Sequence, residues 1–362
     1  MIKVLGLALY GPLAASHRYR LGQYVSGLAG FDIDLQVRHL LGDDYLSAKF
    51  GGRSLPTRVM IKDGMARLED LWHQGDYDVV ILQCELIPLM PGWLERALIR
   101  RPYIYDIDDA FYLKYRSGKM RWARSLLGRK FDTVMAGAAA ITAGNYVLAD
   151  YASCFNANTH YFPTVVDINR YSPNRISIDN SVFTVGWIGS PSTAPYLTEL
   201  ISPLSELGKE CAVKLVVIGG QAPEIPNVNV VKYDWHEHTE LDLINSFDVG
   251  VMPLPNDDWA RGKCAFKLIQ YMACGVPVIA SPVGANVDVV TADCGLLAST
   301  RLEWLEALRR LRDDSKTRNE MGKAGRSRVV THYSLQHNLP IIANLIHNMV
   351  GDISLCAGLQ AT

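Results

Sequence analysis

Short apolar runs, each bounded by turn residues, alternate along the whole chain with longer stretches of helical length. Runs of this length that are rich in valine, isoleucine and leucine are typical of strands buried on both faces. They read IKVLGLAL, DIDLQV, DVVILQ and YIYDI in the first half, and FTVGWIG, KLVVIGG, VNVVKY, DVGVMP and VPVIAS in the second. The helix-length stretches between them include 57–73, 119–138, 195–208 and 265–274. The alternation predicts βαβ units with parallel sheets, and therefore an α/β fold.

The segment 161–181 interrupts this alternation. It combines prolines, asparagines and polar residues without a helical period, as connections between domains do. A chain of 362 residues also exceeds what one hydrophobic core usually organises. The sequence therefore predicts two Rossmann-like domains facing across a cleft, with the boundary near Pro163. Their predicted limits are 1–163 and 164–345, and 346–362 form a C-terminal tail that is a candidate to return to the first domain.

The composition fits an ordinary globular protein, with 49% hydrophobic residues and a formal net charge of -1. This balance gives no reason to expect a nucleic-acid partner. The seven cysteines are scattered without metal-ligand spacing, which favours reduced thiols in a cytoplasmic protein. The apolar start is interpreted as a strand rather than a signal peptide, because it breaks at Gly11-Pro12 and runs into a polar segment.

A strand that runs into a glycine- and serine-containing turn and then into a helix occurs at FTVGWIGSPST, residues 183–193. Backbone N–H groups at such a turn, next to the positive end of a helix dipole, favour an anion. The same pattern is also what any α/β fold needs, so it is not specific by itself. The candidate phosphate-binding residues of this turn are Gly189, Ser190, Ser192 and Thr193.

The most informative stretch is RGKCAFKLIQYMACGVPVIAS, residues 261–281. It predicts a loop, a helix that ends at Cys274-Gly275, and a strand. Lys263 and Lys267 fall at the start of this helix, where their charges can neutralise a diphosphate. The alternative is that both are solvated surface lysines.

Within that stretch, LIQYMACGVPVIAS resembles the donor-site segment of retaining glycosyltransferases of family 4, which have the GT-B fold of two Rossmann-like domains. The likeness continues in FDVGVMPLP, LVVIGG and VVDINRYSP and covers most of the C-terminal half. In the N-terminal half, Gly11 resembles the family's glycine turn that faces the donor phosphates. The resemblance implies a nucleoside diphosphate sugar as co-substrate, transfer with retention, and neither a cofactor nor a metal.

The chain departs from the family at the two glutamates, eight positions apart, that contact the sugar and the ribose. The first position falls on Gly262 and the second on Gln270, whose amide still offers hydrogen bonds to ribose hydroxyls. The chain thus resembles a divergent member of this family. One of the two lysines is similar to the family's phosphate cation. The backbone N–H groups that the resemblance assigns to sugar and phosphate lie near Cys264, Ala265 and Phe266.

A third departure lies in YIYDIDDAF, residues 103–111, where the family's active-site histidine position falls on Asp108. A carboxylate there can stabilise positive charge that develops on the sugar, so we expect Asp108 and Asp109 to be catalytic. The alternative is that both cap the following helix. The triplet Asp106-Ile107-Asp108 is also compatible with a metal-binding DxD motif. That interpretation gives no function to Lys263 and Lys267, because a metal ion would then neutralise the diphosphate.

Two further groups of residues are candidates on weaker grounds. Arg18 and Arg20 follow the first strand and suit a donor phosphate or an anionic acceptor, although arginines on a first helix are common. Tyr233 and Trp235 follow the strand VNVVKY, where this fold places the nucleotide base, although tryptophan is more often simply packed.

The stretch 114–130 carries seven basic residues and no acidic one, with Trp122, Leu126 and Leu127 interleaved. This pattern is typical of a basic amphipathic helix. Such a helix would suit peripheral contact with anionic lipid at the inner face of a membrane. The alternative is a solvated helix whose apolar side packs on the N-terminal core.

The sequence therefore predicts a retaining, metal-independent glycosyltransferase that moves a sugar to a hydroxyl of a glycan or lipid-linked acceptor. Polysaccharide biosynthesis is the expectation that the family resemblance adds. The missing glutamates and histidine leave two alternatives open. One is a non-catalytic protein that binds a nucleotide sugar or a glycan, and the other is a nucleotide-sugar epimerase on the same fold.

Overall fold

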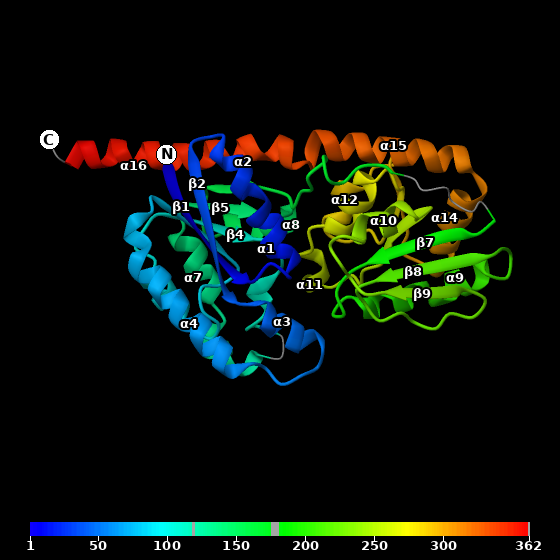
Figure 1. Cartoon of the computed structure of the whole chain (residues 1–362), viewed down its shortest axis with the longest axis horizontal. Coiled ribbons are helices and arrows are strands. Elements are labelled where there is room, and N and C mark those ends of the chain that lie inside the picture. Colours follow the sequence, from blue (N-terminus) through cyan, green and yellow to red (C-terminus); the bar gives the residue numbers. More distant parts are fainter. Residues whose placement is uncertain (118–119, 175–180, 361–362) are drawn as a thin grey trace. The chain divides into compact units, whose positions relative to one another are not determined.

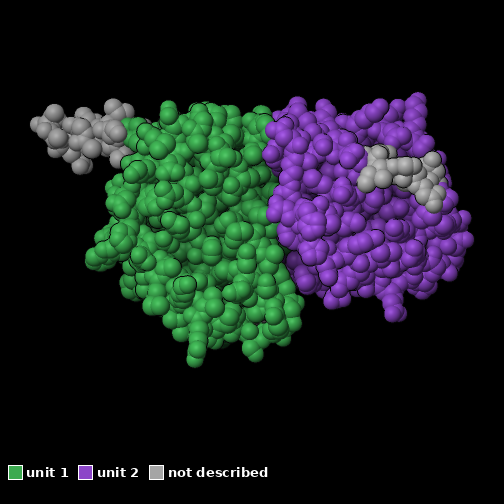
Figure 2. Space-filling model, viewed as in Figure 1, with its two compact units in different colours: residues 1–165, 262–264, 335–362 green, residues 166–261, 265–334 purple. Residues whose placement is uncertain are grey.

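The structure, a computed structural model, describes residues 1–117, 120–174 and 181–360, with side chains described up to residue 351. The chain forms two compact units, coloured separately in Figure 2. Unit 1 comprises 1–165, 262–264 and 335–362, and unit 2 comprises 166–261 and 265–334. The first run of unit 1 ends two residues beyond the boundary placed at 163, and the last helix belongs to unit 1 from Leu335 onward.

Unit 1 is built on a six-stranded parallel sheet with the strand order β2-β1-β3-β4-β5-β6 (Figure 1). Because β1 and β3 are neighbours while β2 lies beyond β1, the strand order reverses between β1 and β3. In open sheets of this kind, ligands bind at the carboxyl ends of the strands near such a reversal. The strands are β1 Ile2–Tyr10, β2 Ile33–Leu41, β3 Val79–Gln83, β4 Tyr103–Ile107, β5 Ala140–Ala143 and β6 Thr159–Tyr161.

The helices of unit 1 cover this sheet, and the largest part of its described core includes residues of the last helix. Leu21, Leu28 and Ile33 pack with Ile342 and Ile346 of the last helix, so the C-terminal segment contributes to the core of unit 1. The helices are α1 Ala15–Arg20, α2 Val25–Ala29, α3 Asp43–Phe50, α4 Thr57–Trp72, α5 Gly92–Leu98, α6 Arg124–Leu127, α7 Lys130–Gly137, α8 Tyr146–Ser153 and α16 Leu335–Gln360.

Unit 2 repeats the architecture, with a six-stranded parallel sheet in the order β12-β11-β10-β7-β8-β9 (Figure 1). Its reversal point lies between β7 and β10. Its core includes Trp187 and Trp304, both fully buried. The strands are β7 Phe183–Ile188, β8 Val213–Ile218, β9 Asn229–Tyr233, β10 Val249–Met252, β11 Val278–Ala280 and β12 Gly295–Leu297. The α-helices are α9 Ile201–Leu207, α10 Glu240–Asn245, α11 Asp258–Arg261, α12 Phe266–Ala273, α13 Asn286–Val289, α14 Arg301–Asp313 and α15 Ser315–His332.

The α/β fold class with two Rossmann-like sheets is confirmed, and each of the nine predicted strands is present. The pattern missed β5, whose sequence AITA is rich in alanine, and the edge strands β6 and β12, which are only partly buried and lack a run of branched apolar residues. The stretch 195–208 is a 3₁₀ helix, Ala194–Leu200, followed by α9, and not one α-helix.

The basic segment 114–130 does not form the predicted continuous amphipathic helix, and this expectation was wrong. Its described part is broken into a 3₁₀ turn at Arg121–Ala123, the four-residue α6 and the beginning of α7. The break comes at Gly128, whose carbonyl accepts a hydrogen bond from Arg116. Lys119 lies outside the described residues.

Buried ion pairs explain part of this basic character. Lys130 is fully buried and donates to Glu85 at 2.7 Å and to Glu95 at 2.9 Å. Lys114 also pairs with Glu85, and Arg116 pairs with Asp132 at 2.6 Å. Three of the seven basic side chains therefore neutralise buried carboxylates within unit 1; Lys130 is fully buried, and Lys114 and Arg116 are partly exposed.

Replacing Lys130 with methionine should strongly destabilise the protein, because two buried carboxylates lose their shared cation. We expect the free energy of unfolding to fall by about 3 kcal/mol, measured by urea denaturation. Its neighbour Arg129, whose side chain is 88% exposed, is the matched control. The Arg129→Met variant should stay within about 0.5 kcal/mol of wild type. Equal stability of the two variants would contradict this role of Lys130.

Candidate functional site

In unit 2, the loop after β7 lies at the reversal point of the sheet, and its first residue is Gly189. The backbone comes unusually close to its neighbours there. A Cβ atom at Gly189 would lie 2.4 Å from Nζ of Lys267 and 2.6 Å from the Trp187 ring. Gly219, which follows β8 with φ +78°, is equally confined, since its Cβ would lie 2.6 Å from the Gly189 carbonyl oxygen. Glycine at both positions therefore permits the close approach of two loops and a lysine.

The rest of this loop is held by its own hydroxyl groups. The Ser190 and Ser192 hydroxyls are 2.8 Å apart, and the Thr193 hydroxyl donates to the Ser190 carbonyl at 3.1 Å. The helix that follows is the seven-residue 3₁₀ element Ala194–Leu200, and not the α-helix that the sequence predicted. Its dipole is correspondingly weaker, so the expected contribution of this helix to anion binding loses its basis.

A lysine from a different element supplies positive charge to the loop instead. Lys267 lies in the first turn of α12, and its Nζ donates to the Thr193 hydroxyl at 3.1 Å. The ammonium also lies 4.1 Å from the centroid of the buried Trp187 ring, a cation–π distance. These contacts fix the cation beside Gly189. The structure thus brings Lys267 together with the predicted turn 189–193.

The backbone at the start of α12 adopts an unusual conformation. Ala265 has φ +53°, in the left-handed region that non-glycine residues rarely occupy, and the helix begins at Phe266. Such a conformation costs about 1 kcal/mol or more and persists only where the surroundings impose it. Helix α12 has eight residues. The first N–H groups of an α-helix have no acceptor within the helix, so the start of α12 offers donors to an anion.

Gln270, further along α12, takes part in a buried hydrogen-bond cluster that the sequence did not reveal. Its Nε2 donates to the Tyr171 hydroxyl at 2.8 Å and to Glu240 Oε1 at 3.1 Å. The Tyr171 hydroxyl also bonds to Glu240, and the Trp235 indole N–H donates to the other oxygen of that carboxylate. Only Gln270 and Trp235 were predicted site residues. Glu240 lies five residues after Trp235 but 30 residues before Gln270, and Tyr171 lies 99 residues before Gln270.

The second aromatic candidate, Tyr233, ends the edge strand β9. Its side chain is 37% exposed, and its backbone pairs with Ile218 at the carboxyl end of β8. Trp235 follows two residues later, and its Cβ would lie 3.1 Å from a Cβ built on Gly219. The Trp235 indole is therefore adjacent to the glycine turn after β8, on the same edge of the sheet as residues 189–193.

In unit 1, carboxylates gather where β4 ends. Asp106 is buried and accepts from Arg20 Nε at 3.0 Å and from the Thr142 hydroxyl at 2.7 Å. Arg20 also donates to the Phe162 carbonyl at 2.7 Å. With its carboxylate occupied by these donors, Asp106 is poorly suited to the metal-binding DxD interpretation.

Asp108 and Asp109 are partly exposed and lie at the carboxyl end of β4. Burial and, second, the neighbouring Asp106 charge together raise the pKa of Asp108 to about 7, against the lowering effect of Arg20. Asp109 forms an ion pair with Lys263 at 3.5 Å. The helical turn that follows, Phe111–Leu113, has no side-chain cap hydrogen bond, so the capping alternative is not supported.

The short stretch 262–264 belongs to unit 1. The Asn145 amide donates to the Lys263 carbonyl at 3.0 Å, and Cys264 Sγ lies 3.1 Å from the Asp108 carbonyl. A Cβ at Gly262 would lie 2.6 Å from that of Ala110. Lys263 therefore neutralises Asp109, while Lys267 lies at the Gly189 loop of unit 2. Sequence analysis alone did not distinguish the two lysines.

The loop after β1 is braced by its neighbours in unit 1. A Cβ at Gly11 would lie 2.7 Å from Oδ1 of Asp43, which accepts from the Leu13 N–H at 2.8 Å. Arg18 donates to the carbonyls of Pro12 and Leu13 at 2.7 and 2.8 Å. Arg18 thus holds the turn that contains Gly11. Arg20, by contrast, is buried against Asp106.

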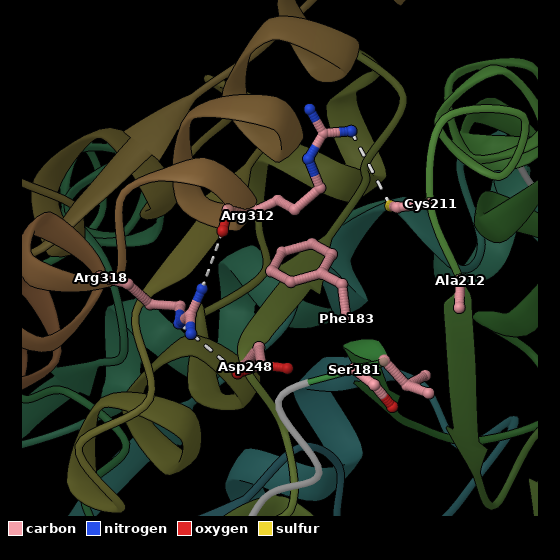
Figure 3. Close-up of a pocket in the computed structure, with 8 residues that line it drawn as sticks. Ser181, Phe183, Cys211, Ala212, Asp248, Arg312 and Arg318 are labelled. Carbon is pink, nitrogen blue, oxygen red and sulfur yellow. Dashed lines mark hydrogen bonds and ion pairs between the residues drawn. The ribbon is translucent and has the colours of Figure 1, made fainter.

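A small cavity of about 120 Å³ lies elsewhere in unit 2, where β7 and β8 begin (Figure 3). Phe183, Arg312 and Arg318 are among its lining residues. Arg318 is 3.5 Å from Asp248, and Arg312 pairs with Glu210 at 2.7 Å. Both arginines therefore already face carboxylates, and the cavity contains none of the candidate residues.

Among the described residues, no three His, Cys, Asp or Glu side chains are grouped so that they could hold a metal ion. In the described part of the chain, no helix combines the length and the apolarity that crossing a membrane requires.

Both the sequence and the fold are similar to those of known proteins. Residues 180–314 match the family described as "Glycosyl transferases group 1". No curated protein matches the sequence. The fold resembles HepE of Anabaena in complex with UDP and glucose, with a TM-score of 0.68 and 14% identity over 96% of this chain and 100% of that chain.

Two further solved structures are similar over nearly their whole length. Sucrose-phosphate synthase from Thermosynechococcus elongatus has a TM-score of 0.69 at 14% identity, covering 97% of this chain and 100% of that chain. WaaG, a glycosyltransferase involved in lipopolysaccharide biosynthesis, has a TM-score of 0.65 at 14% identity, covering 95% and 99%. These likenesses show that the chain has the GT-B fold, and together with the family match they support a glycosyltransferase.

Proposed function

We propose that this protein is a retaining glycosyltransferase that binds a nucleoside diphosphate sugar on unit 2 and transfers the sugar to a hydroxyl of a glycan or lipid-linked acceptor. The observation that carries the proposal is the position of Lys267. Its ammonium is fixed between Thr193 and Trp187, beside Gly189, at the reversal point of the sheet. A diphosphate suits this position because it is an anion that needs both a cation and nearby N–H donors.

In this proposal the donor is held by residues from several loops of unit 2. Lys267, the turn 189–193 and the first N–H groups of α12 hold the diphosphate. Gln270 contacts the ribose, and Tyr233 and Trp235 lie at the base. HepE has been solved with UDP and with UDP-glucose, which makes uridine donors the first class to test.

The chemistry follows from charge placement. As the bond from the anomeric carbon to the diphosphate breaks, negative charge grows on the leaving group and Lys267 stabilises it. Positive charge develops on the sugar ring, and we assign Asp108 and Asp109 of unit 1 to its stabilisation. The departing phosphate accepts the proton of the acceptor hydroxyl on the same face, which retains the anomeric configuration. Lysine takes the place of a metal ion, and no cofactor is required.

Substitution of Lys267 tests the donor site. UDP, GDP, ADP and dTDP are compared by thermal shift and calorimetry with EDTA present, and one nucleotide class should stabilise the wild-type protein. Lys267→Ala should weaken that binding by at least about tenfold, because a charged hydrogen bond contributes about 1.5–3 kcal/mol. Lys263→Ala should have a smaller effect, since Lys263 is paired with Asp109.

Lys316, an exposed lysine of α15, serves as the matched control, and Lys316→Ala should bind like wild type. If no nucleotide binds the wild-type protein, the donor-site proposal is wrong. A strict requirement for magnesium or manganese would contradict the metal-independent mechanism.

The raised pKa of Asp108 predicts a pH-dependent stability. The folded protein retains a proton on Asp108 up to about pH 7, whereas the unfolded chain loses it near pH 4. Stability from this group is therefore greatest in acid and is lost as the pH rises through about 7. Asp108→Asn should gain stability relative to wild type between pH 5 and pH 8, by about 1.4 kcal/mol for each pKa unit of the shift. Urea denaturation at the two pH values measures this gain, and an equal difference at both would refute the shift.

We also propose that part of the segment 114–130 contacts anionic membranes. Because the segment does not form a continuous basic helix, the proposal depends on a few exposed side chains. Trp122 is 72% exposed and Leu126 is 63% exposed, and Arg121 and Arg124 lie beside them. An apolar pair flanked by arginines suits the surface of an anionic bilayer.

Sedimentation with phosphatidylserine vesicles tests this contact. Arg121→Gln/Arg124→Gln should reduce the bound fraction several-fold, because each basic residue near an anionic surface contributes about 1 kcal/mol. Equal sedimentation of the variant and the wild type would end the membrane proposal without affecting the donor site.

A further inference from the structure

We propose that Glu240 is a positioning residue that orients Gln270, so that the carbonyl oxygen of the Gln270 amide faces the donor and accepts a hydrogen bond from a nucleotide hydroxyl. Glu240 is the first residue of α10, and it is 1% exposed. The inference rests on the proposed donor site and adds a residue that neither the sequence pattern nor the family match singles out.

The orientation of the Gln270 amide follows from what a carboxylate can do. An ionised carboxylate only accepts hydrogen bonds, so the amide atom 3.1 Å from Glu240 Oε1 must be the nitrogen. The other N–H of the same nitrogen donates to the Tyr171 hydroxyl at 2.8 Å. Both amide protons are therefore used inside the unit. The carbonyl oxygen is the atom of this amide that remains to accept from a ligand hydroxyl.

The proton on Tyr171 fits the same arrangement. Its hydroxyl accepts from Gln270 and bonds to Glu240, and since the carboxylate cannot donate, the tyrosine must. The backbone of Tyr171 is held in turn by Arg326, which also donates to the carbonyls of Ile168 and Ala273. Each donor in the cluster thus has one acceptor, and rotation of the Gln270 amide would break two hydrogen bonds at once.

Glu240 orients a second donor-site residue at the same time. Its other carboxylate oxygen accepts from the Trp235 indole N–H, which fixes the ring beside Gly219. No basic side chain among the described residues forms an ion pair with Glu240, so its charge is balanced by three neutral donors. A buried charge without a cation is costly and tolerates little disturbance. The carboxylate therefore couples residues of α12 and of the loop after β9.

An exchange of the two side chains tests the proposal. Gln270→Glu alone places two carboxylates about 3 Å apart, where like charges repel. We expect its affinity for the nucleotide that binds the wild-type protein, with UDP tried first, to fall at least tenfold, and its melting temperature to fall. Glu240→Gln alone removes the charge that orients Gln270, and its affinity should fall about fivefold. The double variant Glu240→Gln/Gln270→Glu restores one carboxylate and one amide, and should return to within about threefold of wild type.

Asp242→Asn, an exposed acid in the same turn of α10, is the control for the charge at this helix end and should bind like wild type. If Gln270→Glu binds nucleotide as well as wild type, or if the double variant is no better than the worse single variant, Glu240 does not position Gln270. If the wild-type protein binds none of UDP, GDP, ADP and dTDP, the donor-site proposal itself is wrong. This outcome is measured on the wild-type protein alone and is therefore distinct from the result of the exchange. Should Gln270→Glu fail to fold, the recovery of folding in the double variant still reports the coupling, and its absence contradicts it.

Discussion

The absence of a side chain at Gly189 is the constraint on which the candidate donor site depends. Any Cβ there would occupy the space taken by the Lys267 ammonium and the Trp187 ring. Because no side chain projects from Gly189, a lysine from the first turn of α12 reaches the loop after β7 and donates a hydrogen bond to Thr193. A cation, a glycine-containing turn and a helix start thereby meet at the reversal point of one sheet.

Buried carboxylates organise the remaining features, and the groups that compensate their charge differ from one carboxylate to the next. In unit 1, Arg20 neutralises Asp106, and Lys130 neutralises Glu85 and Glu95. Asp108 forms no ion pair with a basic side chain among the described residues, and burial together with the Asp106 charge raises its pKa. In unit 2, neutral donors surround Glu240. Of the two carboxylates to which the proposed chemistry assigns a role, Asp109 is paired with Lys263 and Asp108 titrates near pH 7.

The sequence predicted the fold in outline because long apolar runs identify buried strands directly. It did not predict the alanine-rich strand β5 or the edge strands β6 and β12, because partly buried edge strands need no continuous apolar run. Lys263 and Lys267 looked alike, because local sequence does not show that one faces Asp109 and the other Trp187. Glu240 could not be predicted at all. Its partners Tyr171 and Gln270 lie 69 and 30 residues away, and only folding brings them together.

Hydrogen–deuterium exchange of the full chain, with and without saturating UDP, tests the central claim most directly. We expect slower exchange in residues 189–193 and at the start of α12, with no change at 181–183 and 211–212, which lie at the opposite ends of β7 and β8. If bound UDP slowed exchange at 181–183 or 211–212 and left 189–193 unchanged, UDP would bind at the other edge of the sheet and the proposed donor site would be wrong.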